Sequence, residues 1–228
     1  VRLNGPVRLG SDVLIDAADG LILFTTAATI DGEVGQSSDL TLSAGDGSVS
    51  FNADIGDTQA IGNLTVTEAG GGVTFGGTGG PDYGVVGSVR TDGEINLGSE
   101  DVIGGKIALN AGDGDTIVFS TSGDRVRFNG AVELQSDVFL DTGLIDPNDP
   151  ASPAGAEIRF TLDAPIDSED GGRNDLVLSA GADGTVSFNA DIGADVALGQ
   201  LIVTEAKGVA FGNDPDAADP DLAPITTV

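Results

Sequence analysis

The sequence contains no histidine, cysteine, methionine or tryptophan among its 228 residues. Without histidine or cysteine it cannot form a Ser/His/Asp triad, a cysteine nucleophile, or a histidine- or thiolate-ligated zinc, copper or iron site. It also has no continuous apolar run long enough to span a bilayer as a helix. Any chemistry would therefore depend on carboxylates, hydroxyls and a small number of cations.

Positive charge is scarce as well: nine lysines and arginines stand against 37 acidic residues, so the formal net charge is −28. A surface of this sign repels phosphate backbones and anionic lipids, and we expect neither a nucleic-acid partner nor insertion into a membrane. By count, 29 of the acids are aspartate and eight are glutamate. Aspartate favours turns and glutamate favours helices. With 36 glycines and 39% hydrophobic residues, the composition indicates short strands joined by many turns.

The chain repeats itself on a large scale. Residues 1–16 return as 126–141, residues 39–56 return as 175–193, and residues 64–77 return as 201–213. We therefore interpret 1–228 as a single domain with large internal repeats at about 1–77 and 126–213. A Pro- and Asp-rich insertion at about 141–156 interrupts the second copy without disturbing the matches after it, and we expect it to be an independent loop.

The elementary unit of the repeats is much shorter, an apolar-x-apolar segment followed by a turn. Leu40 is followed 24 residues later by Leu64, Val49 is followed 24 residues later by Val73, and Leu201 comes 25 residues after Leu176. Period-two alternation is typical of a strand with one buried face. A rung of about 20 to 25 residues suits a β-helix or related solenoid.

An antiparallel β-sandwich is the alternative fold, because it also offers short alternating strands and frequent turns. The turn sequences favour the solenoid. SFNADIG and VTEA each recur intact in the second copy, as expected where like residues stack on like in successive coils. No segment sustains a helical period without interruption by glycine or proline.

The units LTLSAGDGSVSFNADIG and LTVTEAGGGVTFGG resemble the β-strand repeats of very large bacterial surface and secreted proteins, the filamentous-haemagglutinin-like adhesins and exoproteins. The resemblance covers most of the chain in two copies, apart from the insertion at about 141–156 and the tail after Asn213. It implies a right-handed parallel β-helix, export from the cell, and a role in attachment or extracellular structure. It implies no site, because the repeats share no functional residue that can be matched.

We therefore predict an all-β protein, a right-handed parallel β-helix of roughly ten coils. The sequence opens on the strand motif Val1-Arg-Leu-Asn-Gly5 with no visible polar capping repeat, although solenoids usually protect their open ends in this way. This pattern predicts either a segment of a longer repetitive protein or a subunit that stacks end to end with copies of itself.

Asp-rich turns are the main candidates for ligand binding, because Ca²⁺ takes hard oxygen ligands of this type. The candidate calcium ligands are Asp113, Asp115, Asp146, Asp149, Asp214 and Asp216. No turn matches an EF-hand loop or a tandem RTX nonapeptide, and solvated acidic turns are the alternative interpretation. No other cofactor is expected.

Two recurrent residue types are interpreted as structural. Most of the nine phenylalanines follow an apolar residue two positions earlier, which predicts stacked rings inside the solenoid. Asn4, Asn52, Asn129 and Asn189 each directly follow a strand. We expect them to take the left-handed conformation and to form polar ladders between coils.

These observations predict a non-enzymatic structural or adhesive module located outside the cell or on its surface. Its expected partners are neighbouring repeats, further copies of itself, or a surface glycan or protein. The alternative is a polysaccharide-cleaving β-helix enzyme that uses paired carboxylates. The acids Asp54 and Asp191, like Glu68 and Glu205, recur once per large repeat. An active site is normally one irregular constellation, so this repetition argues against catalysis, and no catalytic residue is assigned.

Overall fold

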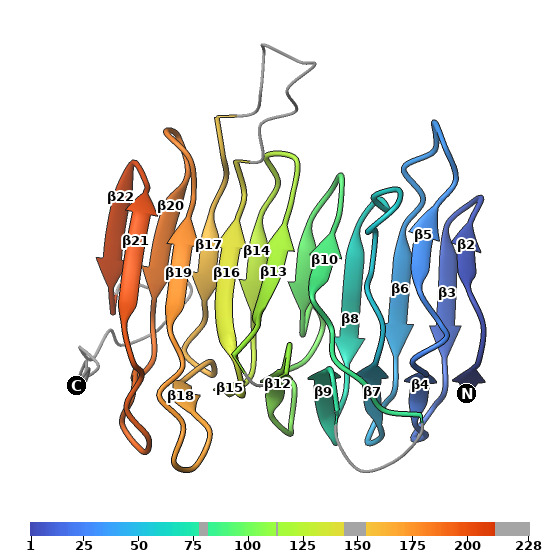
Figure 1. Cartoon of the computed structure of the whole chain (residues 1–228), viewed down its shortest axis with the longest axis horizontal. Coiled ribbons are helices and arrows are strands. Elements are labelled where there is room, and N and C mark those ends of the chain that lie inside the picture. The colour runs from blue at the N-terminus through green and yellow to red at the C-terminus, as the bar shows by residue number, and fades with distance from the viewer. Residues whose placement is uncertain (78–81, 113, 144–153, 213–228) are drawn as a thin grey trace.

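The computed structural model describes residues 1–77, 82–112, 114–143 and 154–212. In these residues it contains 22 strands and no helix, and hence none that could cross a membrane. The strands stack coil upon coil along one axis, and the N-terminal strands lie at the opposite end from β21 and β22 (Figure 1). All the strand-to-strand pairings described are parallel. The predicted parallel β-helix is confirmed, and the sandwich alternative is wrong.

Three sheets, named A, B and C, form the walls of the solenoid. Sheet A contains β1 (Arg2–Leu3), β4 (Ile22–Phe24), β7 (Ser48–Phe51), β9 (Gly72–Phe75), β12 (Ile107–Leu109), β15 (Val132–Leu134) and β18 (Ile166–Ser168). Sheet B contains β2 (Val7–Leu9), β5 (Ile30–Gly32), β10 (Ser88–Arg90), β13 (Thr116–Ser120), β16 (Asp137–Asp141), β19 (Leu176–Ser179) and β21 (Leu201–Glu205). Single bridges from Ile55 to Ile30 and to Val89 join its first two strands to the other five.

Sheet C contains β3 (Val13–Asp16), β6 (Leu40–Ser43), β8 (Leu64–Glu68), β11 (Ile95–Leu97), β14 (Val126–Phe128), β17 (Ile158–Phe160), β20 (Thr185–Phe188) and β22 (Gly208–Phe211). The chain visits sheets A, B and C in turn, so each coil adds one strand to sheet C. Its eight strands define eight coils in the described residues, where roughly ten were predicted. The difference arises because long connections, such as the one between β9 and β10, lengthen a coil without adding a rung.

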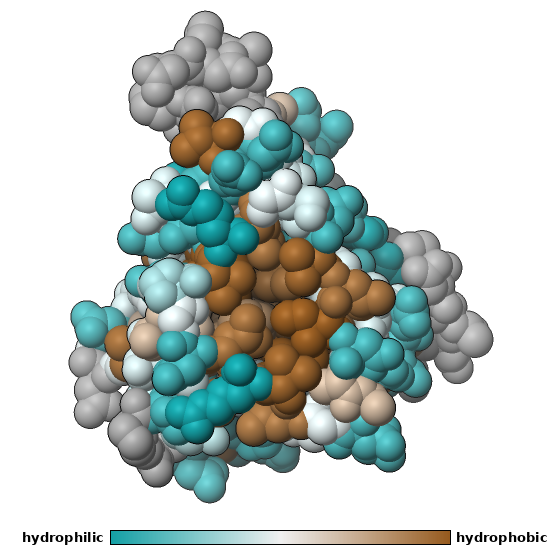
Figure 2. Space-filling model, turned by 90° about the vertical axis from the view of Figure 1, so that its right-hand side faces the viewer, coloured by the Kyte–Doolittle hydropathy of each residue, from teal (hydrophilic) through white to brown (hydrophobic). Residues whose placement is uncertain are grey.

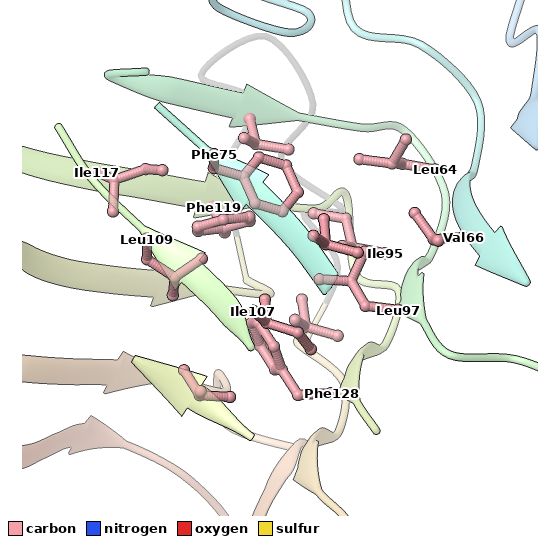
Figure 3. Close-up of a cluster of buried hydrophobic side chains, with 14 of the residues drawn as sticks. Leu64, Val66, Phe75, Ile95, Leu97, Ile107, Leu109, Ile117, Phe119 and Phe128 are labelled. Atoms are coloured by element: carbon pink, nitrogen blue, oxygen red, sulfur yellow. The ribbon is translucent and has the colours of Figure 1, made fainter. Parts of the chain in front are cut away.

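The core consists of inward side chains stacked in columns from coil to coil (Figure 3). Leu64 pairs with Leu40, Val73 with Val49, and Leu201 with Leu176, which confirms the coil spacing read from the sequence. Such columns remove apolar surface from water on all three walls at once, and this burial is the main force favouring the fold.

Eight of the nine phenylalanines form one continuous aromatic path. Phe24, Phe51 and Phe75 stack on sheet A with ring centroids 5.1 and 4.9 Å apart. Phe119 on sheet B makes edge contacts with Phe75 and with Phe128 on sheet C. The path then continues on sheet C through the residues Phe160, Phe188 and Phe211. The expected core role is thus confirmed for seven of these rings, which are fully buried, whereas Phe211 stacks on the path but is 39% exposed.

The aromatic path moves from sheet A to sheet C because the two copies of the duplicated sequence occupy different walls of the solenoid. Strand β4 lies in sheet A, but its counterpart in the second copy, β17, lies in sheet C. Likewise β6 lies in sheet C and its counterpart β19 in sheet B, whereas β5 lies in sheet B and its counterpart β18 in sheet A. Every strand of the second copy is therefore displaced by one wall relative to the first.

Candidate functional site

The structure describes only one of the six candidate calcium ligands. Asp115 lies in the turn before β13, where its backbone N–H donates to the Gly112 carbonyl over 3.2 Å. Asp113, Asp146, Asp149, Asp214 and Asp216 lie outside the described residues. Within the described ranges, no three acidic side chains are arranged to hold a metal ion. The calcium prediction therefore remains a prediction.

Aspartates at the coil corners have a different, well-defined role: they accept hydrogen bonds from the next coil. At the corner before sheet C, Asp12 Oδ1 accepts the backbone N–H of Asp39 at 3.0 Å. Asp39 Oδ1 in turn accepts the backbone N–H of Asn63 at 2.7 Å, and Asn63 Oδ1 accepts the backbone N–H of Glu94 at 2.7 Å. The side chains thus bond turn donors that the sheet ladders leave free.

The second copy repeats this ladder at the corner before sheet B. Asp137 Oδ1 accepts the backbone N–H of Asp175 at 2.8 Å, and Asp175 Oδ2 accepts a side-chain N–H of Gln200 at 2.9 Å. Asp31 and its counterpart Asp167 behave alike, since each accepts two backbone N–H groups of the following coil. This role explains why aspartate is more abundant than glutamate, because the short aspartate side chain is long enough to bond the turn of the adjacent coil and does not extend past it.

The asparagines form polar ladders as predicted, with threonine between them. Thr25 Oγ1 donates to Asn4 Oδ1 over 2.8 Å, and the Asn52 side chain donates to the Phe24 carbonyl over 2.9 Å. In the second copy, Thr161 Oγ1 donates to Asn129 Oδ1 over 2.7 Å, and the Asn189 side chain donates to the carbonyl of Phe160 over 2.7 Å.

The expected left-handed conformation of these asparagines is wrong. In the described residues only Ala18 has a positive φ outside glycine. The left-handed position after SFNADI belongs to Gly56 in the first copy and Gly193 in the second, with φ of +70° and +64°. At Gly56 a Cβ would lie 2.1 Å from the Arg90 carbonyl oxygen, so the close approach of the next coil also requires glycine.

The paired carboxylates weighed as catalytic candidates are not brought together. Asp54 lies beside Ile55 of sheet B, whereas its counterpart Asp191 precedes Ile192, which bridges to sheet A. Glu68 ends β8 in sheet C, and Glu205 ends β21 in sheet B. Asp54 Oδ1 already accepts the backbone N–H groups of Gly87 and Ser88, at 2.8 and 3.0 Å. The duplication therefore distributes these acids along and around the solenoid.

Glu133, Lys106 and Asp124 have shifted pKa values. Burial raises the pKa of Glu133, but hydrogen bonds from Lys106 and Gln135 more than offset this and hold it below its usual value. The hydrogen bond to Glu133 raises the pKa of Lys106. Desolvation, followed by the nearby charge of Glu94, raises the pKa of Asp124. These shifts arise from pairing and crowding on the solenoid surface rather than in a shared cleft.

Sequence reasoning missed one surface feature, an apolar column on the outer side of sheet B. Phe139 points outward there and is half-buried, since Val138 and Leu140 occupy the inward positions of β16. Its column neighbours are Val118, Val177 and Ile202. The signal was present in the sequence, because the residue two positions before Phe139 is Asp137 instead of an apolar one.

Comparison with known protein families, curated proteins and solved structures found no match to this chain. The structure by itself places the protein in the class of parallel β-solenoids. The resemblance of its repeats to filamentous-haemagglutinin-like proteins stays a prediction.

Proposed function

We propose that this protein is a non-enzymatic structural or adhesive module, a stiff segment of a stalk or filament at the cell surface or outside the cell. The observation that supports it best is the use made of the polar side chains. Polar side chains that could otherwise serve in catalysis, such as those of Asp39, Asp54 and Asn52, form hydrogen bonds with neighbouring coils. Their counterparts in the second copy include Asp175 and Asn189, which also bond between coils.

Stiffness along the axis is the mechanical property that such a role requires. Each rung is joined to the next by backbone ladders in the sheets, by core columns and by corner side chains. Bending the rod would have to separate all three on one wall while compressing them on another. Because protein cores are close-packed, they resist this deformation.

The net charge of −28 also suits this role. Like-charged rods repel each other sideways and stay soluble, and salt in the surroundings screens the repulsion within a single rod. A surface glycan or a protein remains the proposed target if the module is adhesive. No cofactor is needed for either role.

A polysaccharide screen tests the proposal against the enzymatic alternative. The purified chain is incubated with a panel of neutral and acidic polysaccharides, and new reducing ends are measured. We expect no turnover from the wild-type protein. Turnover that is lost in Asp54→Asn or Glu68→Gln, but kept in the exposed control Asp57→Asn, would overturn the structural role.

Calcium dependence is tested separately by thermal unfolding with excess Ca²⁺ and with chelator. Binding to the folded protein alone would raise the melting temperature. A melting temperature that is the same in both conditions would remove the six aspartates as calcium ligands. A rise with Ca²⁺ that is abolished in Asp113→Asn together with Asp115→Asn would assign one site to that turn.

A further inference from the structure

The outward positions of the solenoid walls are mostly polar. In the view along the axis, apolar residues fill the interior of the coil and hydrophilic residues predominate around it (Figure 2). Sheet C follows this rule, and its outward side chains from β6 to β20 are Thr41, Thr65, Asn96, Arg127, Arg159 and Ser187. Sheet B departs from it. Its strands β13, β16, β19 and β21 lie side by side (Figure 1), and their outward positions form the apolar column of Val118, Phe139, Val177 and Ile202.

This apolar column is continuous along the middle of the wall. Val118 pairs with Phe139, Phe139 pairs with Val177, and Val177 pairs with Ile202. Since adjacent strands lie about 4.8 Å apart, the column is about 14 Å long. Val118, Phe139 and Val177 are half-buried, and each of their strands has a paired neighbour on both sides. Contiguous apolar side chains on the outer face of a protein are typical of an interaction site.

The first copy of the duplicated sequence shows that the fold does not require this column. The counterpart of Val177 is Thr41, and the counterpart of Ile202 is Thr65. These threonines also face outward, in a column of sheet C that begins at Leu14. The inward residues are unchanged between the copies, and the identical pairs are Leu40 and Leu176, Leu42 and Leu178, Leu64 and Leu201, and Val66 and Val203. The two copies therefore differ where a partner could touch them and agree where the core is packed.

Carboxylates border the column on both sides. Asp137 and Asp141 lie two residues before and two residues after Phe139, on the same face of β16. Asp175 occupies the place of Asp137 on the next coil, and Asp137 Oδ1 accepts its backbone N–H at 2.8 Å. Asp141 Oδ1 accepts the backbone N–H of Gly143 at 2.9 Å. Because β13, β16, β19 and β21 contain no lysine or arginine, this surface is apolar along its centre and negative along its edges.

We propose that the apolar column of sheet B is the docking site for a partner protein that presents a basic amphipathic helix. The inference rests on the proposed structural or adhesive function and names the partner that such a module would bind. Apolar side chains along one stripe of the helix pack on the column, and lysines or arginines on its flanks approach the bordering carboxylates. A helix brings its side chains round about every 5.4 Å, close to the spacing of about 4.8 Å between coils, whereas alternate residues of an extended strand are about 6.6 Å apart.

Two other occupants fit the surface less well. Three of the four column residues are aliphatic, and they match aliphatic side chains better than the face of a sugar ring. A second copy of this chain would bring another net charge of −28 against the same acidic border, and like charges repel. A cationic segment meets neither objection.

Binding of a synthetic peptide tests the proposal. The probe is a helical peptide of about 14 residues, made of leucine and lysine with the leucines on one face, and its dissociation constant is measured by isothermal titration calorimetry at low salt. We expect saturable, micromolar binding, because the surface is small. A peptide with glutamate in place of lysine, and one with serine in place of leucine, should each bind at least about tenfold more weakly.

Variants of the column locate the binding surface. Val177→Thr together with Ile202→Thr installs the residues that the first copy carries at these positions, so this double variant should fold normally and bind the peptide at least about tenfold more weakly. Phe139→Thr should have a similar effect. Leu14→Thr, at the counterpart position of Phe139 and 68% exposed, is the matched control and should bind like the wild-type chain. Circular dichroism verifies that each variant is folded.

Variants of the border test the charge contribution. Asp137→Asn together with Asp141→Asn keeps both acceptor oxygens but removes two charges, so it should weaken binding and reduce its dependence on salt. The control pair is the exposed Asp57 together with Asp46, each replaced by asparagine, which removes the same charge away from sheet B. It should leave the dissociation constant within about twofold of the wild-type value.

Absence of saturable binding, or equal binding by the wild-type chain and the Val177→Thr, Ile202→Thr variant, would overturn the proposal, and the second result would assign the attraction to net charge alone. Two further results would replace the occupant: self-association of the wild-type chain that this double variant loses, or binding of a neutral polysaccharide, without peptide binding, that Phe139→Thr abolishes. A failure of peptide binding without polysaccharide turnover would leave the structural role standing. Turnover of a polysaccharide would remove the structural role without bearing on the peptide.

Discussion

Replacement of Phe51 by alanine gives the most direct test of the continuous core. Phe51 is fully buried and lies between two rings, Phe24 at 5.1 Å and Phe75 at 4.9 Å, with both pairs stacked. Truncating a buried phenylalanine costs about 3–5 kcal/mol. Since two stacked partners are lost as well, at about 0.5–1.5 kcal/mol per pair, we expect Phe51→Ala to fall at or above the top of that range.

Phe211→Ala is the matched control, because Phe211 belongs to the same aromatic path but has one ring partner and is 39% exposed. It should lower the free energy of unfolding by only about 1–2 kcal/mol. Urea titrations followed by circular dichroism give both values by linear extrapolation. Hydrogen exchange shows whether the loss is confined to neighbouring coils, as expected of a solenoid that can open locally. Equal losses in the two variants would refute the continuous aromatic core.

Three further predictions concern buried amides, titrating side chains and salt. Asn52→Asp should destabilise the protein by about 3 kcal/mol or more at pH 7, because it buries a charge at a position 2% exposed; the loss should shrink at about pH 3, and the exposed Asn4→Asp should change little at either pH. Glu133→Gln should lower the melting temperature at pH 7. The pKa of Glu133 is lower in the folded protein than its unfolded value of 4.5, so the ionised side chain stabilises the fold at any pH above 4.5. This contribution is lost as the pH falls through the pKa of the folded state. Asp124→Asn should act in the opposite direction, raising the melting temperature at pH 7, because the raised pKa of Asp124 means that its ionisation opposes folding; both differences should vanish in acid, and shifts of the same sign would contradict the assignment. Raising NaCl from about 10 mM to about 0.5 M should raise the melting temperature of the wild-type chain, since screening weakens the self-repulsion of its acidic surface, and a flat response would contradict this.

The coil spacing could be predicted from the sequence because, in a solenoid, the length of the sequence repeat equals the length of a coil. Leu40 and Leu64 lie one repeat apart in the sequence and pair across a sheet, and so do Val49 and Val73. Phe139 shows the same rule, since alternation alone would have placed it outside. Where a strand has one buried face, period-two patterning is sufficient to assign its inward side chains.

The arrangement of the corners could not be read in the same way. Nothing local distinguishes an asparagine that adopts the left-handed conformation from one that donates to the previous coil, as Asn52 does. The partner of Asp12 lies 27 residues further along the chain, and its identity depends on how many residues each connection adds. For the same reason, the eight coils of the described residues could not be counted from the sequence, because connection lengths vary while the spacing between strands does not.

The displacement of the second copy by one wall has a consequence for how such a chain can grow. A duplication that inserts a whole number of coils keeps every residue facing the same direction, yet this chain tolerates one that does not: β6 and its counterpart β19 face different sides of the rod. A duplicated segment therefore does not need to return to its original wall, because the same sequence forms a strand in either of two walls of the solenoid. A surface motif carried by such a duplication is presented in a new direction around the axis, so lengthening the rod also diversifies what its sides display.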